Sequence, residues 1–152
     1  MKRSHNCGEL RASNIGDTVE LAGWVDRRRD LGGVIFIDLR DKYGKVQVVF
    51  NPSEENNLHE IADSLRNEFV VQIKGLVIAR PDGMENDKIG TGAVDITATE
   101  LIILNKSETP PLSMNDHSET VQEGEEHRLN YRYLDLRRPW VQKNLLLRSK
   151  FV

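Results

Sequence analysis

Apolar and polar residues alternate through most of the first hundred positions of the chain. A period of two puts successive side chains on opposite faces of a β-strand, so each alternating run predicts a strand with one buried face. In the first run, the buried face would be formed by Val19, Leu21, Gly23 and Val25, with Trp24 on the other face. Five such runs occur, at residues 18–26, 34–41, 46–51, 69–79 and 93–104. The pattern predicts a mainly β domain over residues 1–105.

A helical period separates the third run from the fourth. Ser53 is a suitable N-cap, and Glu54 and Glu55 would favour the dipole in the first turn. The apolar stripe of this helix would be formed by Leu58, Ile61, Ala62 and Leu65. Three strands, a helix and two strands is the order of the five-stranded OB-fold barrel, which binds oligonucleotides. Strand order alone also allows a generic small barrel or an unrelated α+β domain.

The periodicity stops after residue 105. Residues 106–127 contain Pro110-Pro111 and a polar acidic stretch, which indicates a linker. Residues 128–152 begin with a basic, aromatic segment, and Pro139 then occupies a position suited to the first residue of a helix. The apolar period of this helix continues to Val152. We therefore expect the chain to be a fragment of a longer protein.

The segment from Gly23 to Asp41 carries the most specific chemistry. Its first strand leads into Arg27, Arg28 and Arg29, which we expect in a glycine-rich turn, and its second strand places Phe36 on the polar face. Arginines bind phosphate and an exposed ring stacks on an unpaired base. A solvated turn and a ring that only packs against its neighbours are the alternatives.

The third strand supplies a partner for this ring. A turn at residues 42–45 would place Phe36 opposite Val49, with Gln47 on the diagonal of the same outward face. The side-chain amide of Gln47 can donate to and accept from a base edge at the same time. Asp38 and Arg40 share this face. The ring, the amide and the arginines together favour a surface for unpaired nucleotides.

Charge is unevenly distributed along the 152 residues, although the net charge is only −3. Lys and Arg number nine against seven Asp and Glu in residues 1–50, six against sixteen in residues 51–130, and six against one in residues 131–152. A local basic patch attracts RNA over about one Debye length, roughly 8–10 Å, whatever the total charge. The acidic total therefore does not exclude a nucleic-acid partner.

The sequence gives little support to membrane, secreted, metal-binding or catalytic classes of protein. No apolar run approaches the roughly 20 residues that span a bilayer, and the first residues lack the apolar segment of a secretory signal. The single cysteine, Cys7, cannot form an internal disulfide and is expected to be a small buried residue in a cytoplasmic protein. The four histidines lack metal-ligand spacing and no catalytic motif is present, so we expect neither a metal site nor catalytic residues.

Several motifs resemble the start of bacterial-type aspartyl-tRNA synthetases, and together they cover nearly the whole chain. They are residues 23–41, Lys45-Val46-Gln47-Val48-Val49-Phe50, Leu65-Arg66-Asn67-Glu68-Phe69-Val70-Val71, Thr91-Gly92 and Arg132-Tyr133-Leu134-Asp135-Leu136-Arg137-Arg138-Pro139. The resemblance implies an OB-fold that binds the anticodon loop of tRNA(Asp), then a hinge, then a class II catalytic domain. That domain uses ATP and Mg²⁺ and works as a homodimer. We expect it to lie beyond Val152, which would leave this chain inactive as a ligase, without a cofactor and monomeric.

The resemblance also implies roles for individual residues. Phe36 would stack on the middle anticodon base and Gln47 would read the edge of that base. Arg29, with Arg27 nearby, would contact the backbone and bases of the anticodon.

Three further residues match positions that face the outer anticodon letters, namely Arg80, Asn86 and Asp95. Residues 84–90 depart from the more usual Asn-Pro-Asn pattern, and Asp95 stands where glutamate is common.

Two alternatives remain open at this point. Lysyl- and asparaginyl-tRNA synthetases use related N-terminal barrels, although the arginine triplet and the doubled arginine before Pro139 fit the aspartyl pattern better. A stand-alone OB-fold that binds single-stranded nucleic acid is the other alternative. Leu31 and Gly83 lie in loops that tune the choice between tRNA(Asp) and tRNA(Asn) in the family, and the sequence does not decide that choice.

Overall fold

A computed structural model describes residues 3–52, 57–112, 114 and 124–151. The chain divides into two compact units, Met1–Glu108 and Thr109–Val152. The elements are, in chain order, the 3₁₀ helix η1 (Ala12–Asn14), β1 (Thr18–Leu31), β2 (Val34–Arg40), β3 (Lys45–Phe50), α1 (Leu58–Asp63), β4 (Val70–Ala79), β5 (Val94–Asn105), α2 (Glu125–Asn130), α3 (Arg132–Asp135) and α4 (Pro139–Phe151).

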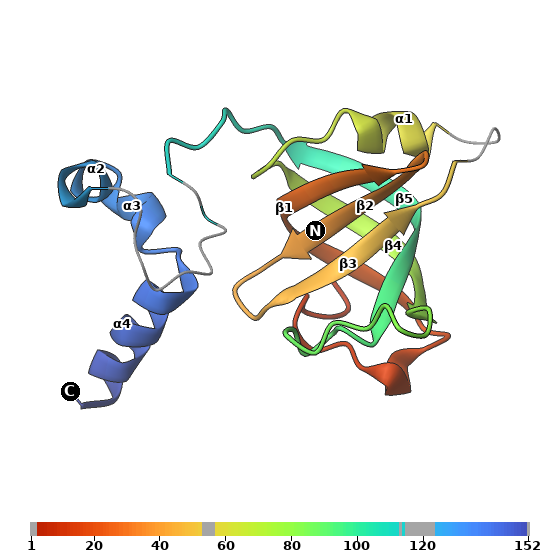
Figure 1. The fold of residues 1–152 in the computed structure, drawn as a ribbon, viewed down its shortest axis with the longest axis horizontal. Helices are drawn as coiled ribbons and strands as arrows, with labels where there is room; N and C mark the ends of the chain where they lie inside the picture. The colour runs from red at the N-terminus through yellow and green to blue at the C-terminus, as the bar shows by residue number, and fades with distance from the viewer. Residues whose placement is uncertain (1–2, 53–56, 113, 115–123, 152) are drawn as a thin grey trace. The chain divides into compact units, whose positions relative to one another are not determined.

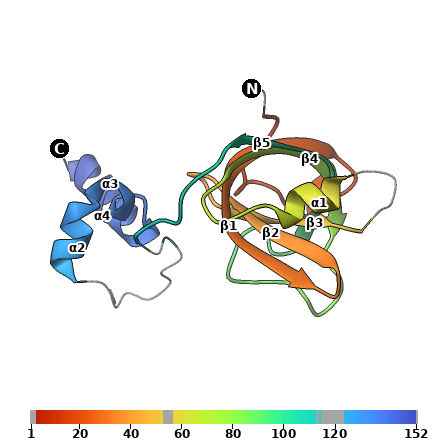
Figure 2. The same ribbon diagram turned by 90° about the horizontal axis from the view of Figure 1, so that it is seen from above.

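The five strands of the first unit close into a barrel in the order β1-β2-β3-β5-β4 (Figure 1). Neighbouring strands are antiparallel except β3 and β5, which run parallel. Figure 2, which looks along the barrel, shows α1 at one end of it. The predicted five-stranded barrel with a helix between its third and fourth strands is confirmed.

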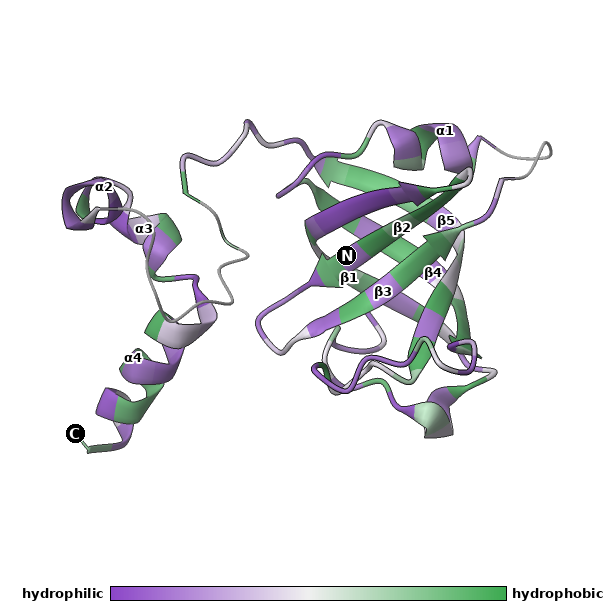
Figure 3. Cartoon of the chain, viewed as in Figure 1, coloured by the Kyte–Doolittle hydropathy of each residue, from purple (hydrophilic) through white to green (hydrophobic). Residues whose placement is uncertain are grey.

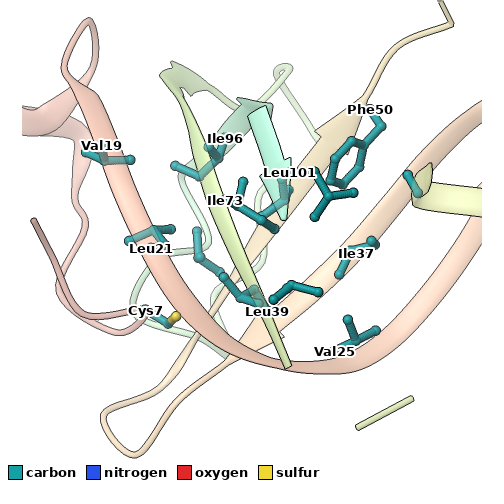
Figure 4. Packing of buried hydrophobic residues seen from close by; sticks show 14 of the residues in the cluster. Cys7, Val19, Leu21, Val25, Ile37, Leu39, Phe50, Ile73, Ile96 and Leu101 are labelled. Carbon is teal, nitrogen blue, oxygen red and sulfur yellow. The ribbon is translucent and has the colours of Figure 1, made fainter. Parts of the chain in front are cut away.

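The core of the barrel consists of the residues that the alternating pattern places inward (Figure 4). Full burial of one Leu or Ile side chain stabilises the fold by roughly 1.5–3 kcal/mol. Cys7 joins this core, as expected, and burial raises the pKa of its thiol, which keeps it protonated. Buried core residues from the strands include Val19, Leu21, Val25, Ile35, Ile37, Leu39, Val46, Val48, Phe50, Val71, Ile73, Val77, Val94 and Ile96.

The expected turn at Arg27, Arg28 and Arg29 is wrong. All three arginines lie within β1 and pair with β2, where they form part of the hydrophilic stretch along β1 in Figure 3. The turn consists only of Gly32 and Gly33, with φ angles of 63° and 87°. A two-residue hairpin turn of this kind needs positive φ at both positions, so two glycines suffice and the strand continues up to them.

Smaller differences concern the helices. Of the helix expected from Ser53, the structure describes α1 with Asn57 as N-cap, while residues 53–56 lie outside the described residues. Leu65 is buried but follows the end of α1. In the second unit, α2 begins at Glu125, so a helix occupies the last residues of the predicted linker, and α4 begins at Pro139 as expected. In the part of the chain that the structure describes, no helix is long and apolar enough to cross a membrane.

Candidate nucleic-acid interface

Strand pairing arranges the outward side chains of the barrel in two rows across β1, β2, β3 and β5. Residues that pair across neighbouring strands project from the same face of the sheet. The first row contains Arg29, Phe36, Val49 and Thr97. The second row contains Arg27, Asp38, Gln47 and Asp95. The expected pairing of Phe36 with Val49 is confirmed, and the sheet brings together five of the seven candidate residues.

A β-bulge in β1 decides which arginines reach this face. Val25 pairs with Leu39 and Arg27 pairs with Asp38, so Asp26 is an extra residue on β1. One extra residue reverses the alternation that follows, because the side-chain period of a strand is two. Odd-numbered residues face the core before the bulge and the outer surface after it. Arg27 and Arg29 therefore join the row of Phe36 and the row of Gln47.

Ion pairs hold the extra residue in place. Asp26 is 3% exposed, and its carboxylate accepts hydrogen bonds from Arg40 Nη1 at 2.5 Å and from Lys45 Nζ at 3.3 Å. Arg40 also donates to Glu68, at 2.7 Å to Oε1. A buried carboxylate persists only when it is paired in this way, because its desolvation costs several kcal/mol. The cluster thus stabilises the bulge from β2, β3 and the segment before β4.

The tip of the β1–β2 hairpin is attached to α1. His59 Nε2 lies 2.6 Å from the carbonyl oxygen of Gly33, which can only accept, so His59 donates this hydrogen bond. Arg28, which faces inward after the bulge, forms an ion pair with Asp63 of α1. These two contacts limit the movement of the hairpin that carries Arg27 and Arg29.

A continuous polar network crosses the face through Gln47. Arg29 Nη2 donates to Asp38 Oδ1 at 2.8 Å and to Gln47 Oε1 at 2.9 Å. Gln47 Nε2 donates to Asp95 Oδ2 at 3.3 Å. Arg80 Nε donates to Asp95 Oδ1 at 2.9 Å. Four of the candidate residues are therefore linked to one another.

Burial separates these residues into two groups. Arg80 and Asp95 are only 7% and 3% exposed and neutralise each other. Phe36, Gln47 and Arg29 are partly exposed, and Arg27 is exposed. The second group has the access that a base or a phosphate requires, whereas the first is covered and is linked to Gln47 through Asp95.

Asn86 lies apart from the network, in the loop between β4 and β5. Its backbone N–H donates to Gly92 O at 3.1 Å, and a Cβ on Gly92 would collide with the carbonyl of Asn86. Thr91 Oγ1 donates to Lys45 O at 2.6 Å, which attaches the same loop to the start of β3. Glycine at position 92 thus permits the close approach of the backbone at Asn86 within this loop.

The sequence reasoning did not single out Asp38, Asp26 or Arg40 as site residues. The available signal was that Asp38 and Arg40 are charged residues at outward positions of the second strand. Nothing in the alternation marked Asp26 as a bulge.

The arrangement offers a stacking ring, an amide and guanidinium groups. Among residues 3–52, 57–112, 114 and 124–151, no group of three or more His, Cys, Asp or Glu side chains could hold a metal ion. An aromatic ring beside cationic side chains on an OB-type barrel defines the class of oligonucleotide-binding domains.

Comparison with known proteins places the chain within this class. Residues 19–104 match the anticodon family of OB-fold nucleic acid binding domains, and the chain belongs to that family.

The chain is similar to two curated proteins along nearly its whole length. It is 54% identical over 150 residues to an aspartate–tRNA(Asp/Asn) ligase from Desulfatibacillum aliphaticivorans, covering 99% of this chain and 25% of that protein. It is 58% identical over 138 residues to an aspartate–tRNA ligase from Listeria monocytogenes, covering 91% of this chain and 23% of that protein. The chain therefore spans about a quarter of the length of these relatives.

The fold is also similar to a solved structure, the asparaginyl-tRNA synthetase from Pyrococcus horikoshii complexed with asparaginyl-adenylate. The TM-score is 0.75 at 28% identity, and the match covers 91% of this chain and 30% of that one.

Proposed function

We propose that this domain binds the anticodon loop of tRNA(Asp) for an aspartate–tRNA ligase. The observation that carries the proposal is the placement of Phe36, Gln47 and Arg29 side by side on the outer face of the barrel. Two relatives named as aspartate–tRNA ligases, at 54% and 58% identity, support the choice of tRNA.

Each side chain has a task suited to its chemistry. Phe36 stacks on the middle base of the anticodon, and Gln47 hydrogen-bonds the edge of that base. Arg27 and Arg29 contact phosphates and neighbouring bases. Stacking contributes roughly 1–3 kcal/mol per base, so one ring with several phosphate contacts suffices for a short single-stranded site.

Of the remaining candidates, Asn86 acts at the outer anticodon letters. It is partly exposed and contacts RNA directly in this proposal. Arg80 and Asp95 are buried and act through Gln47, which hydrogen-bonds Asp95.

The whole protein, in this proposal, attaches aspartate to tRNA(Asp) in the cytoplasm as a homodimer, in a reaction that consumes ATP and requires Mg²⁺. The residues described here select the tRNA, and we assign none of them to ATP or to the metal. The 152-residue chain by itself is expected to bind RNA as a monomer without ligase activity.

Binding to anticodon stem-loops tests the proposal. Isothermal titration calorimetry would compare a stem-loop that carries GUC with one that carries UUU and with unstructured single-stranded DNA of the same length. We expect the GUC stem-loop to bind at least about tenfold more tightly, since each wrong base costs roughly 1–3 kcal/mol. Equal affinity for all three would overturn the proposal and favour a general single-strand binder.

A stem-loop that carries GUU extends the same experiment to tRNA(Asn). The name of the 54% identical relative includes both tRNA(Asp) and tRNA(Asn), which favours this second substrate. An affinity for GUU within about threefold of that for GUC would support recognition of both tRNAs. If GUU binds more weakly by the cost of one wrong base, roughly 1–3 kcal/mol, the domain is limited to tRNA(Asp).

A further inference from the structure

The side-chain amide of Gln47 has two ends with opposite hydrogen-bonding character. Its oxygen only accepts and its nitrogen only donates, and a rotation of 180° about the last side-chain bond exchanges them. A base that stacks on Phe36 would therefore meet a different pattern of donor and acceptor in each orientation. Which orientation the protein imposes decides which base edge fits.

The neighbours of Gln47 permit only one orientation. The guanidinium of Arg29 can only donate, so it requires the amide oxygen, Oε1, at 2.9 Å. The carboxylate of Asp95 can only accept, so it requires the amide nitrogen, Nε2, at 3.3 Å. A rotated amide would place its N–H groups against a cation and its oxygen against an anion. The assignment of the two ends thus rests on the chemistry of the partners.

Both partners are themselves held in place. Asp95 is 3% exposed and is paired with Arg80, whose Nη2 lies 2.7 Å from Asp95 Oδ1. Arg29 is held by Asp38 at 2.8 Å. Because Asp95 is buried, it acts on RNA through Gln47 and not by direct contact. One hydrogen on Nε2 and one lone pair on Oε1 of Gln47 stay available for a base.

We propose that Asp95 and Arg29 are positioning residues that orient the Gln47 amide so that the domain selects uracil over cytosine at the middle anticodon letter; this rests on the function proposed above. Uracil presents an N3–H donor beside an O4 acceptor. Cytosine presents an N3 acceptor beside an N4 amino donor, in the same geometry with the opposite polarity. An amide free to rotate would satisfy either base, whereas a fixed amide satisfies one.

The test compares stem-loops that carry GUC and GCC. For the unaltered domain we expect tighter binding of GUC. In Asp95→Asn, the new side-chain oxygen must still accept from Arg80, which turns the new NH₂ group toward Gln47. The amide of Gln47 then meets donors on both sides and loses its single orientation. We expect the affinity ratio of GUC to GCC to fall by about tenfold, the size of one good bidentate base contact.

Two further variants separate positioning from direct contact. In a Gln47→Ala background, Asp95→Asn should leave the remaining GUC-to-GCC ratio unchanged, because the two residues act as one unit. A direct contact of Asp95 with the base would instead persist in that background and overturn the proposal. Glu100→Gln is the matched control: it removes one negative charge from the same strand, β5, in the exposed pair with Lys74, so the GUC-to-GCC ratio should stay unchanged.

The variant Arg29→Gln tests the other partner of Gln47 and leaves the buried Arg80–Asp95 pair unchanged. Its amide can accept or donate, so Asp95 alone then orients Gln47, and the GUC-to-GCC ratio should fall, but by less than in Asp95→Asn. An unchanged ratio in a folded Arg29→Gln domain would overturn the proposal.

A measurement without RNA distinguishes failure of this inference from failure of the proposed function. In nuclear magnetic resonance spectra of the free domain, the Nε2 proton of Gln47 that donates to Asp95 should have a shift outside the range of exposed glutamine amides, and the shift should return toward that range in Asp95→Asn because the carboxylate acceptor is lost. Absence of that change would refute the fixed amide even if GUC binding is specific. If the change occurs but no stem-loop binds, the amide is fixed but the proposed anticodon function is wrong. The proposed selection of uracil is then wrong as well.

Discussion

At the scale of single residues, the interface depends on a few side chains whose neighbours determine what they can do. Phe36 is partly exposed between Arg29 on β1 and Val49 on β3. One face of its ring can meet a base while the strand holds its position. Gln47 has its polar ends assigned by Arg29 and Asp95. For both residues, the neighbouring strands and side chains therefore decide what the side chain can contact.

Phe36→Ala should weaken binding of the GUC stem-loop by roughly 1–3 kcal/mol, because one stacked base loses its platform. Calorimetric titration measures the loss. Phe36→Leu is the control, since it keeps an apolar side chain but has no flat face, and it should lose nearly as much affinity. An unchanged dissociation constant in the folded alanine variant would remove Phe36 from the site.

At the scale of elements, the bulge at Asp26 reverses the alternation of β1 and brings Arg27 and Arg29 to the outer face. The same reversal turns Arg28 inward, where it pairs with Asp63 of α1. A strand without the bulge would expose the middle arginine alone. The ion pairs of Asp26 with Arg40 and Lys45 therefore help to form the face that we propose binds RNA.

Asp26→Ala should lower the free energy of unfolding by about 1.5–3 kcal/mol, because Arg40 and Lys45 lose a buried acceptor while Arg40 keeps its pair with Glu68. Urea denaturation followed by circular dichroism measures the change. The matched control is Lys74→Ala, which breaks the exposed pair of Lys74 with Glu100 and should change stability little. Equal effects of the two substitutions would show that the Asp26 cluster does not stabilise the bulge.

At the scale of the whole molecule, the net charge of −3 conceals a local concentration of arginines near Phe36. Charges separated by more than roughly 8–10 Å are largely screened at physiological salt, so an RNA strand on this face responds mainly to the arginines beside it. A negative protein can in this way bind a polyanion at one site.

Affinity for the GUC stem-loop should fall as salt rises, because each phosphate contact releases counterions. Arg27→Ala should reduce the magnitude of the slope of log K against log salt by about 0.7, the value for one contact with a single strand. Fluorescence anisotropy titrations from low to moderate salt give the slope. Lys74→Ala, on β4, should leave it unchanged, and a similar slope for both variants would exclude a phosphate contact at Arg27.

Much of the barrel could be predicted because its signal is local. Strands with one buried face must alternate, and β2, β3, β4 and β5 begin and end within one residue of the predicted bounds. Pairing of Phe36 with Val49 also followed from the sequence, because a short turn joins β2 and β3 and sets their register. The length of β1 was underestimated, since a charged run interrupted the alternation that identifies a strand.

The sequence by itself determined the core of the barrel, its helix and the outward position of Phe36 and Gln47, since each depends on residues a few positions apart. Only the tertiary structure decided that Asp95 lies beside Gln47, because β3 and β5 pair in parallel across 48 positions of chain and no local pattern sets that register. It also decided that Arg27 and Arg29 share the face of Phe36, because the bulge at Asp26 depends on ion pairs with Arg40 and Lys45. Contacts between segments far apart in the sequence leave no periodic pattern of apolar and polar residues. Only the folded structure therefore shows all the residues of the candidate site together.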